Sequence, residues 1–320
     1  MGSKGETLPP PGSNQTYVKV SALNGGWVTL PERLFITNAD PEALKTVPSM
    51  CFLIQRPRPG GGPPERIVFD LGIKRDMSQY AAGMQDHLSK RQPITNLPDT
   101  KASLEEGGLD PAKDVDYVIL SHTHWDHIGM PADYPNSKFV LGSGTLHTVK
   151  HGAPHYPPEM FEKDPLPLDR STEFPPGPDS PGKDLACATS QQTSHQWKPI
   201  STLKHAIDFF GDGSVYIIDA PGHLQGHVNL LARLGPEKWV YLGGDCCHDS
   251  RIITGEKEIA MYPDAHGEMR SVHSNLPVAR TTIAMIQDFV KTNGDNVEWI
   301  IAHDKGWADN NQERFFPGKL

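Results

Sequence analysis

Cysteine, basic charge and long apolar runs are all scarce in this sequence. The four cysteines (Cys51, Cys187, Cys246 and Cys247) are too few and too irregularly spaced for a disulfide framework, so we expect a reducing, cytoplasmic setting. Lysine and arginine total 30 against 39 acidic residues, and the net charge of −9 argues against a nucleic-acid partner. No run reaches the about eighteen apolar residues of a membrane helix, so no membrane partner is expected.

Glycine and proline are abundant instead, and they separate short apolar runs that are typical of strands. Helices are predicted over 77–90 and over 273–292, the second ending at Gly294. Strands are predicted at 16–23, 50–55, 66–72, 115–121, 205–210, 214–222, 227–234, 238–245 and 297–304. Two β-rich halves, each with helices, predict two sheets packed face to face with helices outside.

The domain organisation follows from shifts in composition. Residues 1–15 have no apolar pattern and are expected to be a flexible N-terminal lead-in, and residues 16–320 form one domain. The stretch from about 151 to 200 is too rich in proline for regular structure. Because core strands resume after it, we interpret it as an insertion or lid rather than a linker.

Three histidines and an aspartate crowd into residues 122–127, "HTHWDH", directly after the apolar run "VDYVIL". Side chains alternate along a strand, so His122 and His124 point the same way, while Asp126 and His127 lie in the turn that leads to a helix. One pair can bind one cation and the neighbouring pair a second. A solvated histidine-rich loop is a poor alternative, since crowding these groups at a strand end would bring no gain.

These residues resemble the HxHxDH signature of the metallo-β-lactamase fold, and further motifs follow in the order of that family. They are "VFDLG" (68–72), "APGH" (220–223), "GGDCC" (243–247) and "IIAHD" (300–304). The resemblance runs from about residue 16 to 304. It implies an α+β fold, the αββα sandwich of two mixed β-sheets flanked by helices, with metals at the mouth between the sheets.

The resemblance also implies a set of ligands for two metal ions. His122, His124 and His223 would hold the first ion, Asp126, His127 and His303 the second, and Asp245 would bridge both. Asp70 would support the site without being a ligand. Nitrogen and oxygen donors suit zinc, so two Zn²⁺ per chain are expected, although iron, manganese or cobalt also bind such ligands.

Two residues are candidates for catalysis. In this family two metals about 3.5–4 Å apart share a hydroxide that attacks a carbonyl carbon, and Asp126 would orient it and shuttle its proton. Lactonases of the family usually carry tyrosine three residues after the bridging aspartate, where this sequence has His248. Imidazole can deliver a proton near neutral pH, which matters most for a leaving amide nitrogen. His248 is therefore a candidate general acid, and a merely supporting hydrogen-bond role stays open.

The branch that the sequence most resembles contains N-acyl homoserine lactonases and enzymes that open γ-lactams and cyclic carbamates such as benzoxazolinones. We therefore expect a dinuclear-zinc hydrolase, monomer or homodimer, that opens a small-molecule lactam or lactone in detoxification or degradation. Alternatives are an N-acyl homoserine lactonase acting in quorum quenching, a glyoxalase II-like thioesterase, and a persulfide dioxygenase with one iron. A non-catalytic binding module would require lost ligands, and none is lost.

Other residues have weaker interpretations. The side chains of Trp125, Met130, Tyr156, Phe161 and Trp197 could form an apolar wall for the substrate, and core packing is the alternative for each. The histidine at position 227 is expected to face away from the metals and to serve packing.

Overall fold

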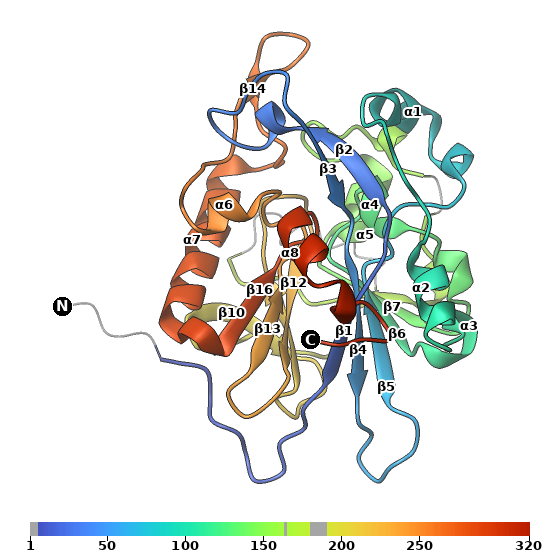
Figure 1. Ribbon diagram of the computed structural model, residues 1–320, viewed down its shortest axis with the longest axis vertical. Coiled ribbons are helices and arrows are strands. Elements are labelled where there is room, and N and C mark those ends of the chain that lie inside the picture. The colour runs from blue at the N-terminus through green and yellow to red at the C-terminus, as the bar shows by residue number, and fades with distance from the viewer. Residues whose placement is uncertain (1–5, 163–164, 180–190) are drawn as a thin grey trace, which may run out of the picture.

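The computed structural model describes residues 6–162, 165–179 and 191–320, and within these ranges the strands form two six-stranded sheets. The first sheet has the order β1 (Lys19–Leu23), β4 (Cys51–Arg56), β5 (Glu65–Phe69), β6 (Tyr117–Leu120), β7 (Lys138–Leu141) and β8 (Ser171–Glu173). The second has the order β16 (Val297–Ile300), β13 (Trp239–Leu242), β12 (Val228–Arg233), β11 (Val215–Asp219), β10 (Leu203–Asp208) and β9 (Lys198–Ile200). The sheets face each other, and helices lie on both outer sides (Figure 1).

Both sheets are mixed. Strands β1, β4 and β5 pair antiparallel, whereas β5 to β8 run parallel. In the second sheet only the β13–β16 pair is parallel among the described strands. The predicted sandwich of two mixed sheets with helices outside is therefore confirmed, and the strands predicted at 50–55 and 66–72 pair with each other.

The main core lies between the sheets. Phe52 and Phe69 of the first sheet belong to the same buried cluster as Ile217 and Leu230 of the second. Most residues of these strands are buried, because helices cover the outer faces of the sheets, and the strands therefore appear in the sequence as short apolar runs.

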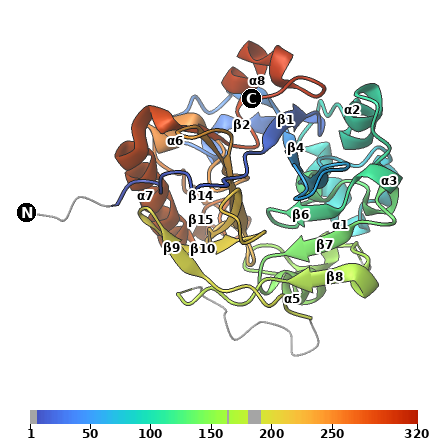
Figure 2. The ribbon, with the colours of Figure 1, turned by 90° about the horizontal axis from the view of Figure 1, so that it is seen from below.

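A long helix covers the outer face of the second sheet. Helix α7 (Leu276–Asn293) packs Ile283, Ile286 and Phe289 against that sheet (Figure 2). Asn275 caps its first turn by accepting a hydrogen bond from the backbone N–H of Val278. The helix predicted over 273–292 is confirmed, and it ends before Gly294, which has a φ of 54°.

Shorter helices complete the fold. The first sheet is covered by α2 (Thr100–Glu106), α3 (Pro111–Asp114) and α5 (Thr145–His151), whereas Met84 and Leu88 of α1 (Ala82–Ser89) belong to the same buried cluster as Val28 and Leu30. Others lie in loops: α4 (Trp125–Ile128), α6 (Ser250–Ile253) and α8 (Lys305–Asn310). Hairpins β2 (Trp27–Pro31)–β3 (Leu44–Pro48) and β14 (Tyr262–Pro263)–β15 (Met269–Arg270) extend at one end of the sandwich (Figure 1). No helix in the described ranges is long and apolar enough to cross a membrane.

The helix predicted over 77–90 is confirmed over Ala82–Ser89, but the structure interrupts it at Tyr80. A short 3-10 helix, Met77–Gln79, ends at Tyr80, whose ψ of 146° is extended, and α1 begins only at Ala82. The buried hydroxyl of Tyr80 donates to the carbonyl of Trp125 at 2.7 Å and accepts from the backbone N–H of Lys74 at 2.8 Å. These distant partners hold Tyr80 outside a helix, and no local pattern reveals them.

The proline-rich stretch also contains short regular elements. Strand β8 extends the first sheet and β9 extends the second, so residues 171–173 and 198–200 correct the expectation of no regular structure there. Residues 163–164 and 180–190 of this stretch lie outside the described residues, as do residues 1–5 of the expected lead-in. The lead-in contacts the domain at Leu8, because the backbone N–H of Leu8 donates to Oδ1 of Asn293 at 2.8 Å.

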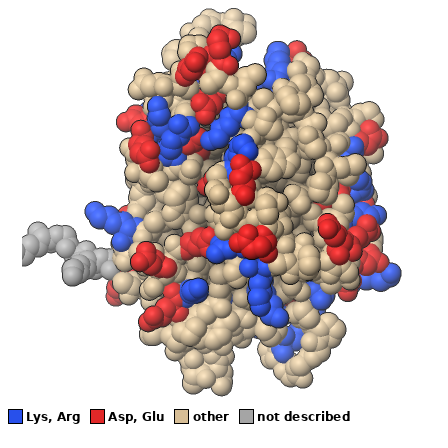
Figure 3. Space-filling model, viewed as in Figure 1, with Lys and Arg blue, Asp and Glu red and all other residues tan. Residues whose placement is uncertain are grey.

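Charged side chains of both signs are interspersed on the face drawn in Figure 3. Several form pairs, including Arg314 with Glu298, whose Nη1 and Oε1 lie 2.6 Å apart. The face therefore mixes both signs, although the chain is acidic as a whole.

Candidate metal centre

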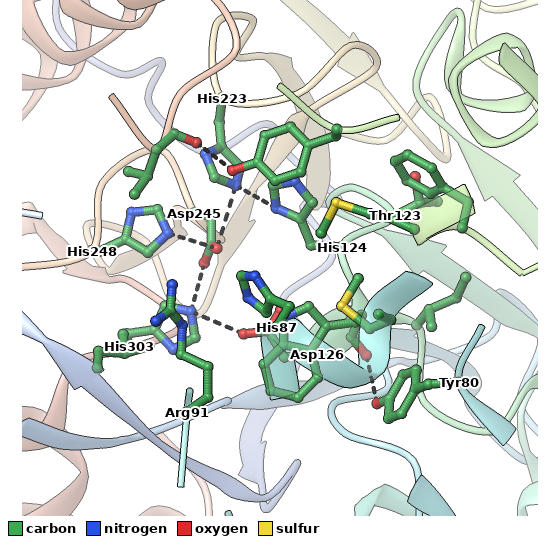
Figure 4. Close-up of a pocket in the computed structure, with 18 of the residues that line it drawn as sticks. Tyr80, His87, Arg91, Thr123, His124, Asp126, His223, Asp245, His248 and His303 are labelled. Atoms are coloured by element: carbon green, nitrogen blue, oxygen red, sulfur yellow. Dashed lines mark hydrogen bonds and ion pairs between the residues drawn. The ribbon is translucent and has the colours of Figure 1, made fainter. Parts of the chain in front are cut away.

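Loops after four strands bring seven side chains together at one end of the sandwich. These loops follow β6, β11, β13 and β16, because the ends of neighbouring strands meet at the same edge of a sheet. The side chains are those of His122, His124, Asp126, His127, His223, Asp245 and His303. Each residue is at most 9% exposed. The structure thus collects all seven residues that the sequence suggested as ligands, and Figure 4 shows five of them, His124, Asp126, His223, Asp245 and His303.

The first group is built from three imidazole rings. Nε2 of His122, Nδ1 of His124 and Nε2 of His223 lie 2.9 to 3.2 Å from one another. Burial lowers the pKa of all three rings well below the ordinary value, so each is neutral and carries a lone pair. Oδ2 of Asp245 lies 3.4 Å from Nε2 of His223. Three converging lone pairs beside a carboxylate match the donor set of a divalent cation.

The second group shares Asp245 with the first. Oδ1 of Asp245 lies 3.2 Å from Nε2 of His127 and 3.2 Å from Nε2 of His303. Oδ2 of Asp126 lies 3.6 Å from the same nitrogen of His303. Burial opposes protonation of His127 and His303, but the nearby carboxylate of Asp245 outweighs it and raises both pKa values. The space between these rings and carboxylates therefore favours positive charge.

Several of the converging atoms have no hydrogen-bond partner. Among the described residues, the converging atoms Nε2 of His127 and Oδ1 of Asp245 are buried without one, and so is the other ring nitrogen of His124, Nε2. A buried polar atom without a partner costs free energy, typically about 1–3 kcal/mol. His127 and Asp245 point their free atoms at each other without hydrogen-bond alignment. Buried nitrogen and oxygen atoms without hydrogen-bond partners are the atoms expected to bind a metal ion at such a site.

Asp70 lies behind the second group, as expected of a supporting residue. Its Oδ2 accepts hydrogen bonds from Nδ1 of His127 at 2.9 Å and from Oγ of Ser121 at 2.7 Å, and its Oδ1 accepts from the backbone N–H of Ser121 at 2.6 Å. Asp70 has a φ of 64°, a conformation that non-glycine residues rarely adopt. Strain of this kind persists where the surrounding structure enforces it, which is common at functional sites.

His303 is oriented in a similar way. Its Nδ1 donates to the carbonyl of Pro48 at 2.7 Å, which turns Nε2 toward Asp245. Pro48 is the last residue of β3, so the β2–β3 hairpin orients the ring of His303, which follows β16.

His248 lies directly beside the shared carboxylate. Its Nε2 is 3.1 Å from Oδ2 of Asp245, and its ring stacks on that of His303 at a centroid distance of 5.4 Å. On the other side it contacts the ring of Phe35 at 4.8 Å. Nδ1 of His248 has no hydrogen-bond partner among the described atoms.

Sequence reasoning missed two supporting histidines. The expectation that His227 faces away is wrong, because its Nε2 accepts the backbone N–H of Asp245 at 3.2 Å while its Nδ1 donates to the carbonyl of Ala220 at 3.1 Å. Nδ1 of His273 lies 3.3 Å from Nδ1 of His223. His273 precedes α7, some distance along the chain, and nothing in its local sequence pattern signals this contact.

A pocket opens over the metal centre. Its floor includes Asp126, Asp245, His248 and His303, and its walls are mostly apolar. The walls include Leu30, Phe35, Met84, Trp125, Tyr156, Met160, Phe161 and Val272. Three of the aromatic residues suggested for a substrate wall therefore line the pocket. Met130 and Trp197 do not, and the indole of Trp197 instead donates to the carbonyl of Pro175 at 2.8 Å.

Solved structures share this fold along the whole chain. A B. thuringiensis AiiA variant with N-decanoyl-L-homoserine bound at its active site superposes with a TM-score of 0.64, at 17% identity, over 98% of this chain and 100% of that one. The hydrolase AbOPH of the beta lactamase superfamily has a TM-score of 0.50 at 16% identity, over 95% and 91% of the two chains. At these identities the similarity concerns the fold.

Sequence comparison decides the family. Gamma-lactamase MBL2 of Gibberella moniliformis is 31% identical over 193 residues, which are 57% of this chain and 70% of that protein. This chain belongs to the metallo-β-lactamase superfamily. The superfamily suggested by the HxHxDH segment is thus confirmed, although no family model matches the sequence.

Longer superfamily relatives contain a region like this chain within a larger protein. Cytochrome P450 monooxygenase mpaDE' of Penicillium brevicompactum is 28% identical over 97% of this chain, yet the match covers only 36% of that protein. This metallo-β-lactamase superfamily member thus spans about a third of the length of such relatives.

Proposed function

We propose that this protein is a metal-dependent hydrolase that opens the ring of a small cyclic amide, carbamate or ester. The observation that carries the proposal is the pair of His/Asp groups that share Asp245 beneath an apolar pocket. Relatives named gamma-lactamase, FDB1 of Fusarium pseudograminearum and MBL2, support a lactam as substrate.

Two zinc ions per chain fit the proposed ligands. His122, His124 and His223 would hold one, and Asp126, His127 and His303 the other, with Asp245 between them. Divalent cations bound there would supply a Lewis acid for the substrate carbonyl and would lower the pKa of water. Two complete groups also favour this function over a dioxygenase with a single iron.

Asp126 has the position of a proton carrier in this proposal. It lines the pocket. Among the described residues, its carboxylate forms an ion pair with the neighbouring ring of His303 alone. Its backbone is fixed, because Oγ of Ser49 donates to the Asp126 carbonyl at 2.5 Å. A carboxylate held in this way can orient a water molecule and accept its proton.

His248 is the proposed donor to the leaving atom. It lines the pocket, Nε2 is anchored on Asp245, and Nδ1 has no hydrogen-bond partner among the described atoms. The competing role, support of Asp245 alone, rests on the same 3.1 Å contact. The two roles differ in substrate dependence, because a leaving amide nitrogen needs a proton more than a leaving ester oxygen does.

A His248→Phe variant separates these roles. Loss of a general acid reduces rates by roughly 100- to 10,000-fold, and we expect that loss on a lactam but a much smaller loss on the lactone of the same ring. Equal losses on both rings would identify support of the metal centre, and full turnover of the lactam would remove His248 from catalysis altogether.

N-acyl homoserine lactonase is the second candidate. N-acyl homoserine lactonase AttM of Rhizobium radiobacter is 30% identical over 44% of this chain. Activity confined to acyl homoserine lactones would favour it over the lactamase function.

The proposed function is tested with matched rings. Zinc-loaded protein is incubated with a lactone, with the lactam of the same ring, and with benzoxazolinone, and products are identified by mass. We expect at least one nitrogen ring to gain one water, and chelation of the metal to abolish the reaction. Cleavage of thioesters with no ring opened would overturn the proposal and favour a glyoxalase II-like thioesterase.

A further inference from the structure

One cationic side chain of the pocket has no anionic partner. Arg91 lines the pocket, and in the described part of the chain its guanidinium forms no ion pair. A side-chain hydrogen bond runs from Nη1 of Arg91 to the carbonyl of the adjacent Lys90 at 3.5 Å, which is long for a hydrogen bond. Figure 4 shows the side chain pointing toward the metal centre, near His303 and His87.

The carboxylates of the pocket are already engaged. Glu162 pairs with Lys74, whose Nζ lies 3.1 Å from its Oε2. Asp126 and Asp245 face the histidines of the metal centre. Among the described residues, none of these carboxylates forms an ion pair or hydrogen bond with Arg91, and the charge of Asp126 acts on it only from a distance.

The surroundings of Arg91 add positive charge. Arg270 lies over the rings of Tyr156 and Tyr262, 5.7 Å from each centroid, and its Nε is buried without a hydrogen-bond partner among the described residues. Burial, together with Arg91, Lys90 and Arg270, lowers the pKa of His87 to about 3, so this ring is neutral. Burial also lowers the pKa of Arg91, but arginine remains charged in proteins.

The position of Arg91 is fixed by its backbone. The residue follows α1, and its carbonyl accepts the N–H of Thr29 in β2 at 3.1 Å. Its own N–H donates to the carbonyl of Leu88 at 3.1 Å. The planar fork of the guanidinium is pre-organised, so arginine loses less conformational freedom per hydrogen bond than lysine would when it binds a ligand.

We propose that Arg91 binds a carboxylate of the ligand, so that the substrate is a lactam or lactone bearing an acidic substituent. Guanidinium binds carboxylate through two parallel N–H···O bonds, and these charge-assisted bonds are strongest away from water. The inference rests on the proposed ring-opening function. A carboxylate is also formed when the ring opens, and the experiment separates this source from a substituent already on the substrate.

The first test uses a lactone that carries a carboxylate and the methyl ester of the same compound. Arg91→Gln should lower kcat/KM for the acid by about tenfold to a hundredfold, mainly through KM, with a clearly smaller effect on the ester. Arg91→Lys should recover part of the lost kcat/KM, because lysine keeps the positive charge but cannot form the two parallel hydrogen bonds of a guanidinium. Arg280→Gln is the matched control, since Arg280 is an exposed residue of α7 that does not line the pocket.

The second test does not depend on turnover. Binding of benzoate and of benzamide, which share a ring but differ in charge, is measured by calorimetry on the zinc-loaded protein. Arg91→Gln should weaken benzoate binding by about tenfold or more and change benzamide binding little. An unchanged acid-to-ester ratio and unchanged benzoate affinity would overturn the proposal.

The remaining outcomes separate the sources of the carboxylate and the two proposals. If only inhibition by the ring-opened product depends on Arg91, the carboxylate contact is supported and the acidic substrate class is overturned. If wild-type protein opens no ring while benzoate binding still depends on Arg91, the proposed function fails and the carboxylate site stands.

Discussion

Nδ1 of His127 lies 2.9 Å from Oδ2 of Asp70, and this contact decides which ring nitrogen faces the metal centre. Because Nδ1 donates to Asp70, Nε2 is the ring nitrogen that faces Asp245. Asp70 itself is held by two hydrogen bonds from Ser121, the residue just before His122. The end of β5 thus orients the residues that follow β6.

Asp70→Asn tests this relationship. Replacing a carboxylate that orients a metal-binding histidine typically lowers metal affinity by about 10- to 100-fold, and we expect that loss, measured by competition with a chromophoric chelator. Asparagine tolerates the positive φ of this position, so the fold should be retained. Unchanged zinc affinity would show that Asp70 does not orient His127.

His273 is expected to orient His223. Their Nδ1 atoms lie 3.3 Å apart, and a metal-binding histidine usually hydrogen-bonds through its other nitrogen. His273→Ala should lower zinc affinity at the first group by about tenfold or more, seen as weaker binding of one of the two equivalents. His266→Ala is the control, because this exposed histidine lies in the β14–β15 hairpin away from the site. Identical zinc binding by both variants would exclude the role of His273.

Asp249 should make stability depend on pH at acidic values. Burial alone would raise its pKa, but hydrogen bonds from Arg251 and the charge of Lys45 lower it to about 2. A carboxyl group whose pKa is lower when folded stabilises the protein above its unfolded pKa of about 4 and loses this contribution as pH falls toward 2. Stability should therefore decline between these values.

The Asp249→Asn variant isolates this contribution. Asparagine can still cap α6, so the charge is what changes. We expect the variant to lose about 2 kcal/mol of unfolding free energy near neutral pH and to approach the wild type near pH 2, measured by denaturant titration. A difference that does not vary with pH would contradict the assignment.

Phe289 should be important for the layer under α7. It is fully buried against the second sheet, with its ring 5.7 Å from that of Tyr241. Phe289→Ala should cost about 3–5 kcal/mol of unfolding free energy, while Lys291→Ala, an exposed change on the same helix, should cost less than about 0.5 kcal/mol. A loss for Phe289→Ala no larger than for the control would contradict this packing.

The sequence predicted the parts of the site that are local. His122 to His127 lie within six residues directly after β6, so their closeness follows from the sequence, although β6 ends at Leu120 and their directions are set by the loop and by α4. His223, Asp245 and His303 each follow a strand, so motifs at strand ends were sufficient to place them at one edge.

The parts that the sequence did not predict depend on contacts between distant segments. Tyr80 interrupts a helical pattern because its hydroxyl reaches Trp125, and His227 serves the backbone of Asp245. Arg91 is unremarkable in the sequence, and its importance follows from which groups of the pocket lack a partner. Such relationships appear only when the three-dimensional neighbours of each group are known.

The central claim is that two metal ions in this cluster enable ring opening. Metal-free protein is titrated with zinc, and bound metal and hydrolysis of the preferred ring are measured in the same samples. We predict that activity reaches its maximum at two zinc ions per chain and that Asp245→Asn abolishes it. Full activity at one metal per chain, or without metal, would contradict the account.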